Sequence, residues 1–208
     1  MSNSFKIYLA RHGQDQDNAA GILNGHRDKT LTIVGIEQAN ILAKTIEENG
    51  LGITKIYSSP LQRAYKTAEI VADYLNIENP TKLDLLIERN FGIMTGKLVK
   101  DIEKLCAPNI LKADPITYFI SVENSETFPQ MVKRAKKLLK WIKKNHATEN
   151  ILLVSHGDIG KMIYAAFYNL NWKEVLTKFH FGNSEVLLLL ENSKPDERHV
   201  HKVKQHNH

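Results

Sequence analysis

The sequence of 208 residues predicts an α/β fold with a largely parallel central sheet. Short apolar runs alternate along the chain with longer segments of helical periodicity, which is typical of parallel strands joined by crossover helices. The composition, 42% hydrophobic and 25% charged residues, is that of a globular protein and excludes a largely disordered chain. No repeat or low-complexity break divides residues 5–191, so we expect a single domain over residues 1–191.

Short runs rich in Ile, Leu, Val or Tyr are the predicted strands, at residues 5–10, 55–58, 84–87, 150–154 and 185–191. Apolar residues with helical spacing predict the helices, at residues 32–48, 60–74, 125–144 and 158–168, with weaker ones after Lys97 and after Trp172. Thr32 is placed to cap the first of these helices, and Ser59 the second, with Pro60 at its first position.

Several classes of protein are excluded by the same sequence. The longest strongly apolar run, residues 186–190, is too short to cross a bilayer, so we expect no membrane partner. The N-terminal residues lack the apolar core and cleavage pattern of a secretory signal, so we expect a cytoplasmic protein. The single cysteine, Cys106, excludes an intramolecular disulfide and a zinc site of paired cysteines, and we interpret it as an apolar packing residue.

The charge of the chain gives a weaker indication. The net charge is +5, and much of the excess lies in residues 133–144, where apolar residues with helical spacing indicate a solvated basic helix face. No aromatic or nucleic-acid motif accompanies it, so we predict no nucleic-acid partner. Residues 192–208 are polar and predict a flexible tail; its histidines lack a carboxylate or a scaffold, so we predict no metal site there (His199, His201, His206 and His208).

Polar clusters follow three of the predicted strands at their carboxyl ends. They are Arg11-His12-Gly13, Ser58-Ser59 with Arg63 one helical turn further on, and Ser155-His156-Gly157. Ligands of open α/β sheets bind at this edge, because the carboxyl ends of parallel strands meet there. The sequence therefore predicts that two arginines and two histidines converge at one site.

Such a site suits a phosphoryl group. The guanidinium groups of Arg11 and Arg63 can neutralise a phosphate dianion without a metal, because they present paired donors and stay charged. Neighbouring cations lower the pKa of a histidine, so His12 can be an uncharged nucleophile that attacks phosphorus. Gly13, without a side chain, is expected to leave room for close approach of the substrate.

The residues around these clusters resemble the histidine phosphatase superfamily, the phosphoglycerate mutase-like proteins. The first block is Leu9-Ala10-Arg11-His12-Gly13-Gln14 followed by Asn18. The others come in the order of the family: Gly25-His26-Arg27-Asp28, Leu31-Thr32-Ile33-Val34-Gly35 with Gln38-Ala39, Ser58-Ser59-Pro60-Leu61-Gln62-Arg63-Ala64 with Thr67-Ala68, Glu88 before Phe91-Gly92, and Val154-Ser155-His156-Gly157. The resemblance covers roughly residues 5–190 and implies a three-layer α/β/α sandwich.

The resemblance also implies a role for each matching residue. His12 matches the nucleophile that becomes phosphorylated, and Glu88 matches the proton donor. The other matching residues bind the phosphoryl group: Arg11, Asn18, Arg63 and His156. The implied reaction is hydrolysis of a small-molecule phosphomonoester through a phosphohistidine, with no metal and no cofactor.

Two features of the sequence leave alternatives open. Asp15 stands where the family usually has Ser or Thr, so we expect it either to point away from the phosphate or to be offset by the substrate. The compact interval from Glu88 to His156 favours a phosphatase over a cofactor-dependent phosphoglycerate mutase, and retention of both residues disfavours a non-catalytic phospho-ligand binder. No motif in residues 96–124 specifies the substrate, and none in the chain specifies an oligomeric state.

Overall fold

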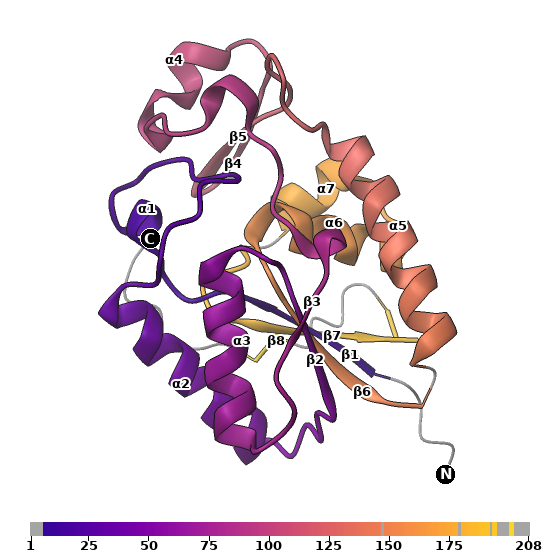
Figure 1. Cartoon of the computed structure of the whole chain (residues 1–208). Coiled ribbons are helices and arrows are strands. Elements are labelled where there is room, and N and C mark those ends of the chain that lie inside the picture. The colour runs from indigo at the N-terminus through magenta and orange to yellow at the C-terminus, as the bar shows by residue number, and fades with distance from the viewer. Residues whose placement is uncertain (1–5, 147, 179, 192, 195–199, 202–208) are drawn as a thin grey trace.

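A six-stranded sheet forms the centre of the computed structural model, which describes residues 6–146, 148–178, 180–191, 193–194 and 200–201 (Figure 1). Its strand order is β3-β2-β6-β1-β7-β8. The strands are β1 (Lys6–Arg11), β2 (Lys55–Ser58), β3 (Thr81–Lys82), β6 (Asn150–Ser155), β7 (Val186–Leu190) and β8 (Val200–His201). The pairs β1–β6, β6–β2 and β2–β3 are parallel, whereas β7 runs antiparallel to β1. The predicted, mostly parallel sheet is confirmed.

Helices cover both faces of this sheet. One face packs against α2 (Ile33–Glu48) and α3 (Gln62–Leu75), and the other against α5 (Phe128–Asn145), α6 (Gly157–Phe167) and α7 (Trp172–Lys178) (Figure 1). Two shorter helices, α1 (Gln16–Ala19) and α4 (Ile102–Cys106), lie above the carboxyl ends of the strands. The arrangement is a three-layer α/β/α sandwich, as predicted.

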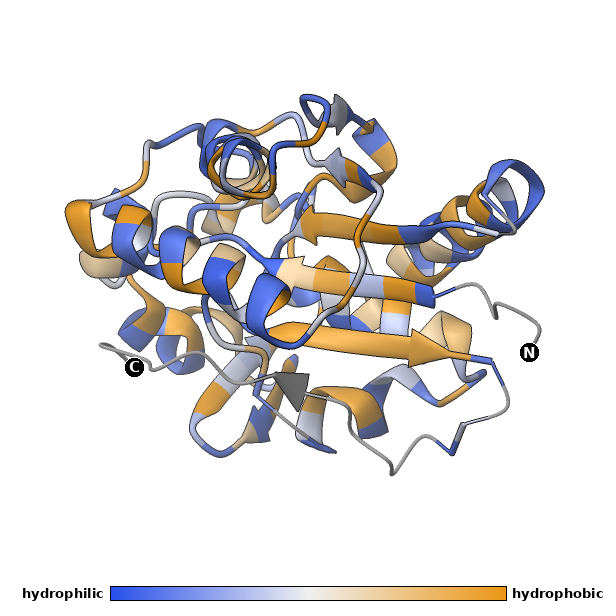
Figure 2. Cartoon of the chain, turned by 90° about the horizontal axis from the view of Figure 1, so that it is seen from below, coloured by the Kyte–Doolittle hydropathy of each residue, from blue (hydrophilic) through white to orange (hydrophobic). Residues whose placement is uncertain are grey.

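The alternation of side chains along β1 shows how the two layers of core form. Ile7 and Leu9 are buried on the side of α5 and α6, whereas Tyr8 and Ala10 are buried on the side of α2 and α3. The strands are correspondingly hydrophobic along most of their length (Figure 2). Because a strand buried on both faces has no polar side, it appears in the sequence as a continuous apolar run.

The predicted strand at residues 84–87 is wrong. Asp84–Leu86 is a turn of 3-10 helix, in which Leu86 N–H donates to the Leu83 carbonyl at 3.0 Å. The parallel edge strand β3 ends at Lys82, and the chain then turns over the carboxyl end of the sheet. The apolar run at residues 84–87 predicts burial, and Leu86 is buried. The amides of Leu86 and Ile87, however, are satisfied within the turn and not in a strand ladder.

The starts of the helices are only partly as predicted. Thr32 caps α2, since its hydroxyl accepts from the Gly35 amide at 3.0 Å. The cap predicted for α3 is wrong: this helix begins at Gln62, whose amide donates at 2.6 Å to the carboxylate of Asp28 from a distant loop. The Ser59 hydroxyl accepts from the Leu61 amide at 3.3 Å, which precedes the first helical residue, and it also lies 2.8 Å from His156 Nε2.

A small hairpin of β4 (Ile110–Ala113) and β5 (Ile116–Phe119) projects above the sheet and is absent from the prediction. It packs with α4 over a separate apolar cluster that includes Phe91, Ile102 and Phe119. Cys106 is buried in the same cluster, as its interpretation as a packing residue requires.

Most of the predicted tail, residues 192–208, lies outside the described residues, as do three of its four histidines. The described parts are residues 193–194 and β8, and β8 pairs with β7 in register Val186 to His201, so this part of the tail belongs to the sheet. Among the described helices, none combines the length and the apolar character that a membrane span requires.

Two glycines set the position of α2 against the loop that follows β1. A Cβ atom on Gly13 would lie 2.2 Å from the carbonyl oxygen of Gly35, and one on Gly35 would lie 2.0 Å from the carbonyl oxygen of Gln14. The expectation that Gly13 leaves room for substrate is therefore wrong. The space beside Gly13 is filled by the backbone of α2, which holds the loop carrying His12 in place.

We expect Gly35→Ala to destabilise the protein by about 3 kcal/mol, because a methyl group there overpacks two backbone segments that cannot both move away. The free energy of unfolding from urea titration measures this loss. Glu37→Ala, an exposed change in the same helix, is the matched control and should stay within about 0.5 kcal/mol of the parent. Equal stability of the two variants would contradict the role assigned to this backbone contact.

Candidate active site

His12 follows β1 directly and is buried at the carboxyl edge of the sheet. Its Nδ1 atom lies 2.6 Å from the carbonyl oxygen of Gly13. A carbonyl only accepts hydrogen bonds, so Nδ1 carries the proton and Nε2 keeps an unshared electron pair. Local backbone geometry therefore fixes the tautomer in which Nε2 can act as a nucleophile.

Arg63, from the first turn of α3, is completely buried beside this histidine. Its Nε lies 3.3 Å from His12 Nε2 and 3.2 Å from His156 Nδ1. Its terminal nitrogens donate at 2.7 and 2.8 Å to the backbone carbonyls of Arg27 and Gly25. The guanidinium is thus held on the side of the site formed by residues 25–27.

His156 follows β6 and completes the convergence predicted from the strand ends. Its Nδ1 accepts from Arg63, so its Nε2 carries the proton and donates to Ser59 Oγ at 2.8 Å. The ring centres of His156 and His12 lie 5.0 Å apart. Burial, followed by the positive charge of Arg63, lowers the pKa of both imidazoles well below the usual value. Both rings are therefore neutral at physiological pH.

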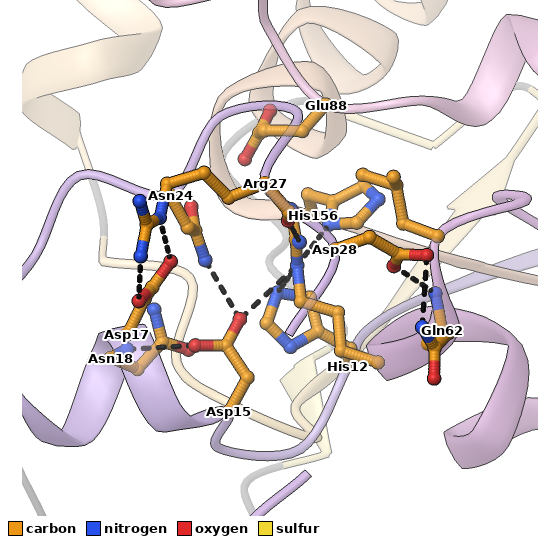
Figure 3. A network of polar contacts seen from close by, with 12 residues as sticks. His12, Asp15, Asp17, Asn18, Asn24, Arg27, Asp28, Gln62, Glu88 and His156 are labelled. Atoms are coloured by element: carbon orange, nitrogen blue, oxygen red, sulfur yellow. Dashed lines mark hydrogen bonds and ion pairs between the residues drawn. The ribbon is translucent and has the colours of Figure 1, made fainter. Parts of the chain in front are cut away.

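Asp15 points toward Arg63, a contact that neither of the two alternatives expected for it includes. Its Oδ2 lies 3.2 Å from Arg63 Nε and accepts from Asn24 Nδ2 at 2.7 Å, while Oδ1 accepts from the Asn18 amide and caps α1 (Figure 3). The side chains of Asp15 and Arg63 are both fully buried. The negative charge is offset by an arginine of the protein itself.

Arg11, the last residue of β1, has one donor uncommitted. Its Nη1 donates to the Phe181 carbonyl at 2.8 Å, whereas its buried Nε has no hydrogen-bond acceptor among the described residues. Leaving such a donor without a partner is costly, so this atom indicates an anion-binding position. Arg11, His12, Asn18 and Glu88 all line one cavity of about 160 Å³.

Glu88 enters this cavity from the loop that follows the 3-10 turn, on the opposite side of the site from His12 (Figure 3). Its Oε1 accepts from the amides of Arg89 at 2.8 Å and Ile159 at 3.2 Å, whereas its Oε2 has only a 3.4 Å contact with the Asp158 amide. Burial, with the nearby charge of Asp158, raises the pKa of Glu88 to about 7. The carboxyl group can therefore both donate and accept a proton near neutrality.

Two buried or half-buried arginines position the Glu88 loop, and sequence reasoning missed both. Arg89 donates to the carbonyls of Phe119, Ile120 and Glu126, and Arg134 of α5 donates to the carbonyls of Leu85 and Ile87. The signal for Arg89 was its place directly after Glu88 in an otherwise apolar stretch. No sequence signal marks Arg134, because it belongs to a run of basic residues whose spacing is that of an ordinary solvent-exposed helix face.

Comparison with known proteins identifies the family. The family model of the histidine phosphatase superfamily (branch 1) matches residues 7–202. The chain belongs to this superfamily. It is 29% identical over 174 residues to Phosphoserine phosphatase 1 of Hydrogenobacter thermophilus, covering 84% of this chain and 79% of the relative.

A second relative is named as a mutase. The 2,3-bisphosphoglycerate-dependent phosphoglycerate mutase of Bartonella tribocorum is 26% identical over 176 residues, covering 83% of this chain and 85% of the relative. The solved structure of Bacillus stearothermophilus YhfR superposes with a TM-score of 0.76 at 26% identity, covering 89% of this chain and 90% of that one. The family and the fold implied by the resemblance are confirmed, and the chain is an enzyme of this phosphatase family.

We expect Asp15→Asn to tighten the binding of inorganic phosphate about tenfold, because it removes a negative charge beside Arg63 while two backbone carbonyls still hold the guanidinium. Isothermal titration with phosphate measures the change. Asp17→Asn is the matched control, since Asp17 is a buried carboxylate of the same helix whose partner is the partly exposed Arg27. Weaker binding by a folded Asp15→Asn would contradict this electrostatic account.

Proposed function

We propose that this protein is a phosphomonoester hydrolase that works through a phosphohistidine on His12, with Glu88 as general acid and base. One observation carries the proposal. His12 and Glu88 line the same cavity. The Gly13 carbonyl fixes the His12 tautomer in which Nε2 is free, and the carboxyl group of Glu88 has a pKa of about 7. A nucleophile and a proton donor on one cavity, with arginines beside them, are the groups that transfer of a phosphoryl group requires.

In the first step, His12 Nε2 attacks phosphorus as the bond from phosphorus to the leaving oxygen breaks. Glu88 gives its proton to that oxygen, so the product leaves as an alcohol. We assign the remaining phosphoryl oxygens to Arg11 and Asn18, which line the cavity, with Arg63 and His156 buried next to His12. Their positive charge and donors stabilise the transition state in a site from which most water is excluded.

In the second step, a water molecule takes the place of the departed alcohol. The Glu88 carboxylate takes a proton from this water while the water oxygen attacks phosphorus. The bond between phosphorus and His12 Nε2 breaks in the same step. Inorganic phosphate is released, and both residues return to their starting states. The arginines supply the positive charge throughout, so the proposed mechanism uses no metal and no cofactor.

A phosphatase is favoured over a mutase by the segment between Glu88 and His156. This segment holds only short elements above the sheet, the β4–β5 hairpin and α4, before the long helix α5. A mutase must keep its phosphoenzyme away from water while its product reorients, and a short cover serves this less well. Release of inorganic phosphate, measured beside conversion of 3- to 2-phosphoglycerate, distinguishes the two activities.

The nucleophile is tested by trapping the intermediate. We expect His12→Ala to lose at least about a thousandfold in turnover, because no other group can form the covalent bond. Acid-quenched mixing with a ³²P-labelled monoester should leave a base-stable, acid-labile phosphate on the parent protein only. A labelled, folded His12→Ala protein, verified by its thermal unfolding, would refute the assignment.

The role of Glu88 is tested by pH and by the leaving group. Its carboxyl holds the donated proton below pH 7 and loses it above, so single-turnover phosphorylation by an alkyl phosphate should fall about tenfold for each pH unit above 7. Phosphorylation by p-nitrophenyl phosphate, whose phenolate leaves without a proton, should stay nearly flat.

Two variants separate this role from charge stabilisation. Glu88→Gln should remove the alkaline decline and slow the alkyl phosphate far more than p-nitrophenyl phosphate. Arg63→Lys loses the planar donor arrangement and should slow both substrates by a similar factor. An equal effect of Glu88→Gln on both substrates would exclude the general-acid role.

A further inference from the structure

The catalytic cavity opens into a second one that the proposed chemistry does not use. The outer cavity has a volume of about 330 Å³. It shares with the catalytic cavity several lining residues, among them Arg11, Asn18, Phe91 and Asp158. The leaving group of a phosphoryl group bound beside Arg11 and His12 can therefore extend into this outer cavity.

The walls of the outer cavity are mainly apolar. They come from three separate segments: the loop after α1, the 3-10 turn Val99–Asp101 with the start of α4, and the β4–β5 hairpin. The side chains are Ile22, Leu23, Val99, Ile102, Ile116 and Phe119. An apolar wall contributed by segments far apart in sequence, next to a polar reaction centre, is typical of a ligand pocket.

Apart from Arg11, whose free donor is assigned to the phosphoryl group, the charged side chains of these walls already have partners. Arg89 donates to three backbone carbonyls and pairs with Asp158 at 3.6 Å. Lys161, on the catalytic side, donates to the Tyr118 hydroxyl at 2.6 Å and to the Leu176 carbonyl at 3.3 Å. A carboxylate on the leaving group would have to break these contacts, and it would meet the negative charge of Asp158.

We propose that the outer cavity binds an uncharged, apolar leaving group, so that the substrates are phosphomonoesters of apolar alcohols or phenols. This inference rests on the proposed function and adds the substrate class to it. The ring or alkyl chain packs between the hairpin and the start of α4, while Arg11 and Arg63 hold the phosphoryl group at the other end.

The test compares alkyl phosphates whose leaving groups are all alkoxides, so that differences in rate report the pocket and not the leaving-group chemistry. We expect kcat/KM for 2-phenylethyl phosphate to exceed that for ethyl phosphate by about thirtyfold, from burial of the ring. O-phosphoserine and 3-phosphoglycerate, which carry carboxylates, should not exceed ethyl phosphate.

Variants of the wall locate the effect. Val99→Asn and Ile116→Asn place an amide in the cavity and should each lower the preference for 2-phenylethyl over ethyl phosphate at least about fivefold. Val99 is 45% exposed, so its variant is expected to fold. Leu105→Asn is the matched control, because Leu105 is 51% exposed on α4 and does not line the cavity. Its preference should equal that of the parent.

The outcomes separate the two proposals. If no monoester is hydrolysed and His12 is not labelled, the proposed function fails. If His12 is labelled but O-phosphoserine or 3-phosphoglycerate matches or exceeds 2-phenylethyl phosphate in kcat/KM, the phosphatase stands and the apolar substrate class is overturned. An unchanged preference in both wall variants also overturns it, because the ring would then bind elsewhere.

Discussion

The buried charge of Arg63 is the constraint on which the arrangement of the site depends. A fully buried guanidinium is strongly destabilising unless its donors and its charge are satisfied. Here the acceptors are Asp15 from the loop after β1, the carbonyls of Gly25 and Arg27, and the imidazoles of His12 and His156 (Figure 3). Satisfying one side chain thus fixes three segments of chain relative to one another.

The same charge sets the protonation of its neighbours. Because Arg63 faces Nε2 of His12 and Nδ1 of His156, a proton at either atom would meet a positive charge in a buried site. Each ring instead keeps its proton on the far nitrogen, toward Gly13 in one case and Ser59 in the other. Glu88, on the opposite side of the site, has its pKa raised by burial. One group is kept without a proton and the other with one, as the proposed roles of nucleophile and acid require.

The sequence predicted the parts of this site that follow from strand order. Parallel strands end at the same edge, so Arg11, His12 and His156 had to meet once the strands were recognised. The role of Glu88 came only from family resemblance, because a glutamate in a loop carries no local signal. The Asp15–Arg63 pair and the β4–β5 hairpin depend on contacts between residues far apart in sequence. Local periodicity predicts none of these contacts, and in residues 84–87 it indicated burial but the wrong backbone.

The two halves of the cavity depend on different parts of the chain, and Arg89 joins them. The phosphoryl half is built at the sheet edge, where β1, β6 and α3 carry or precede Arg11, His12, His156 and Arg63. The outer half is built on the hairpin and α4, which pack over their own small apolar cluster. Arg89 links the hairpin carbonyls of Phe119 and Ile120 to Asp158 at the start of α6, beside the amides that hold Glu88. We therefore expect that the hairpin can change its apolar wall without moving the groups proposed to act on phosphorus, as long as Arg89 keeps its carbonyl acceptors.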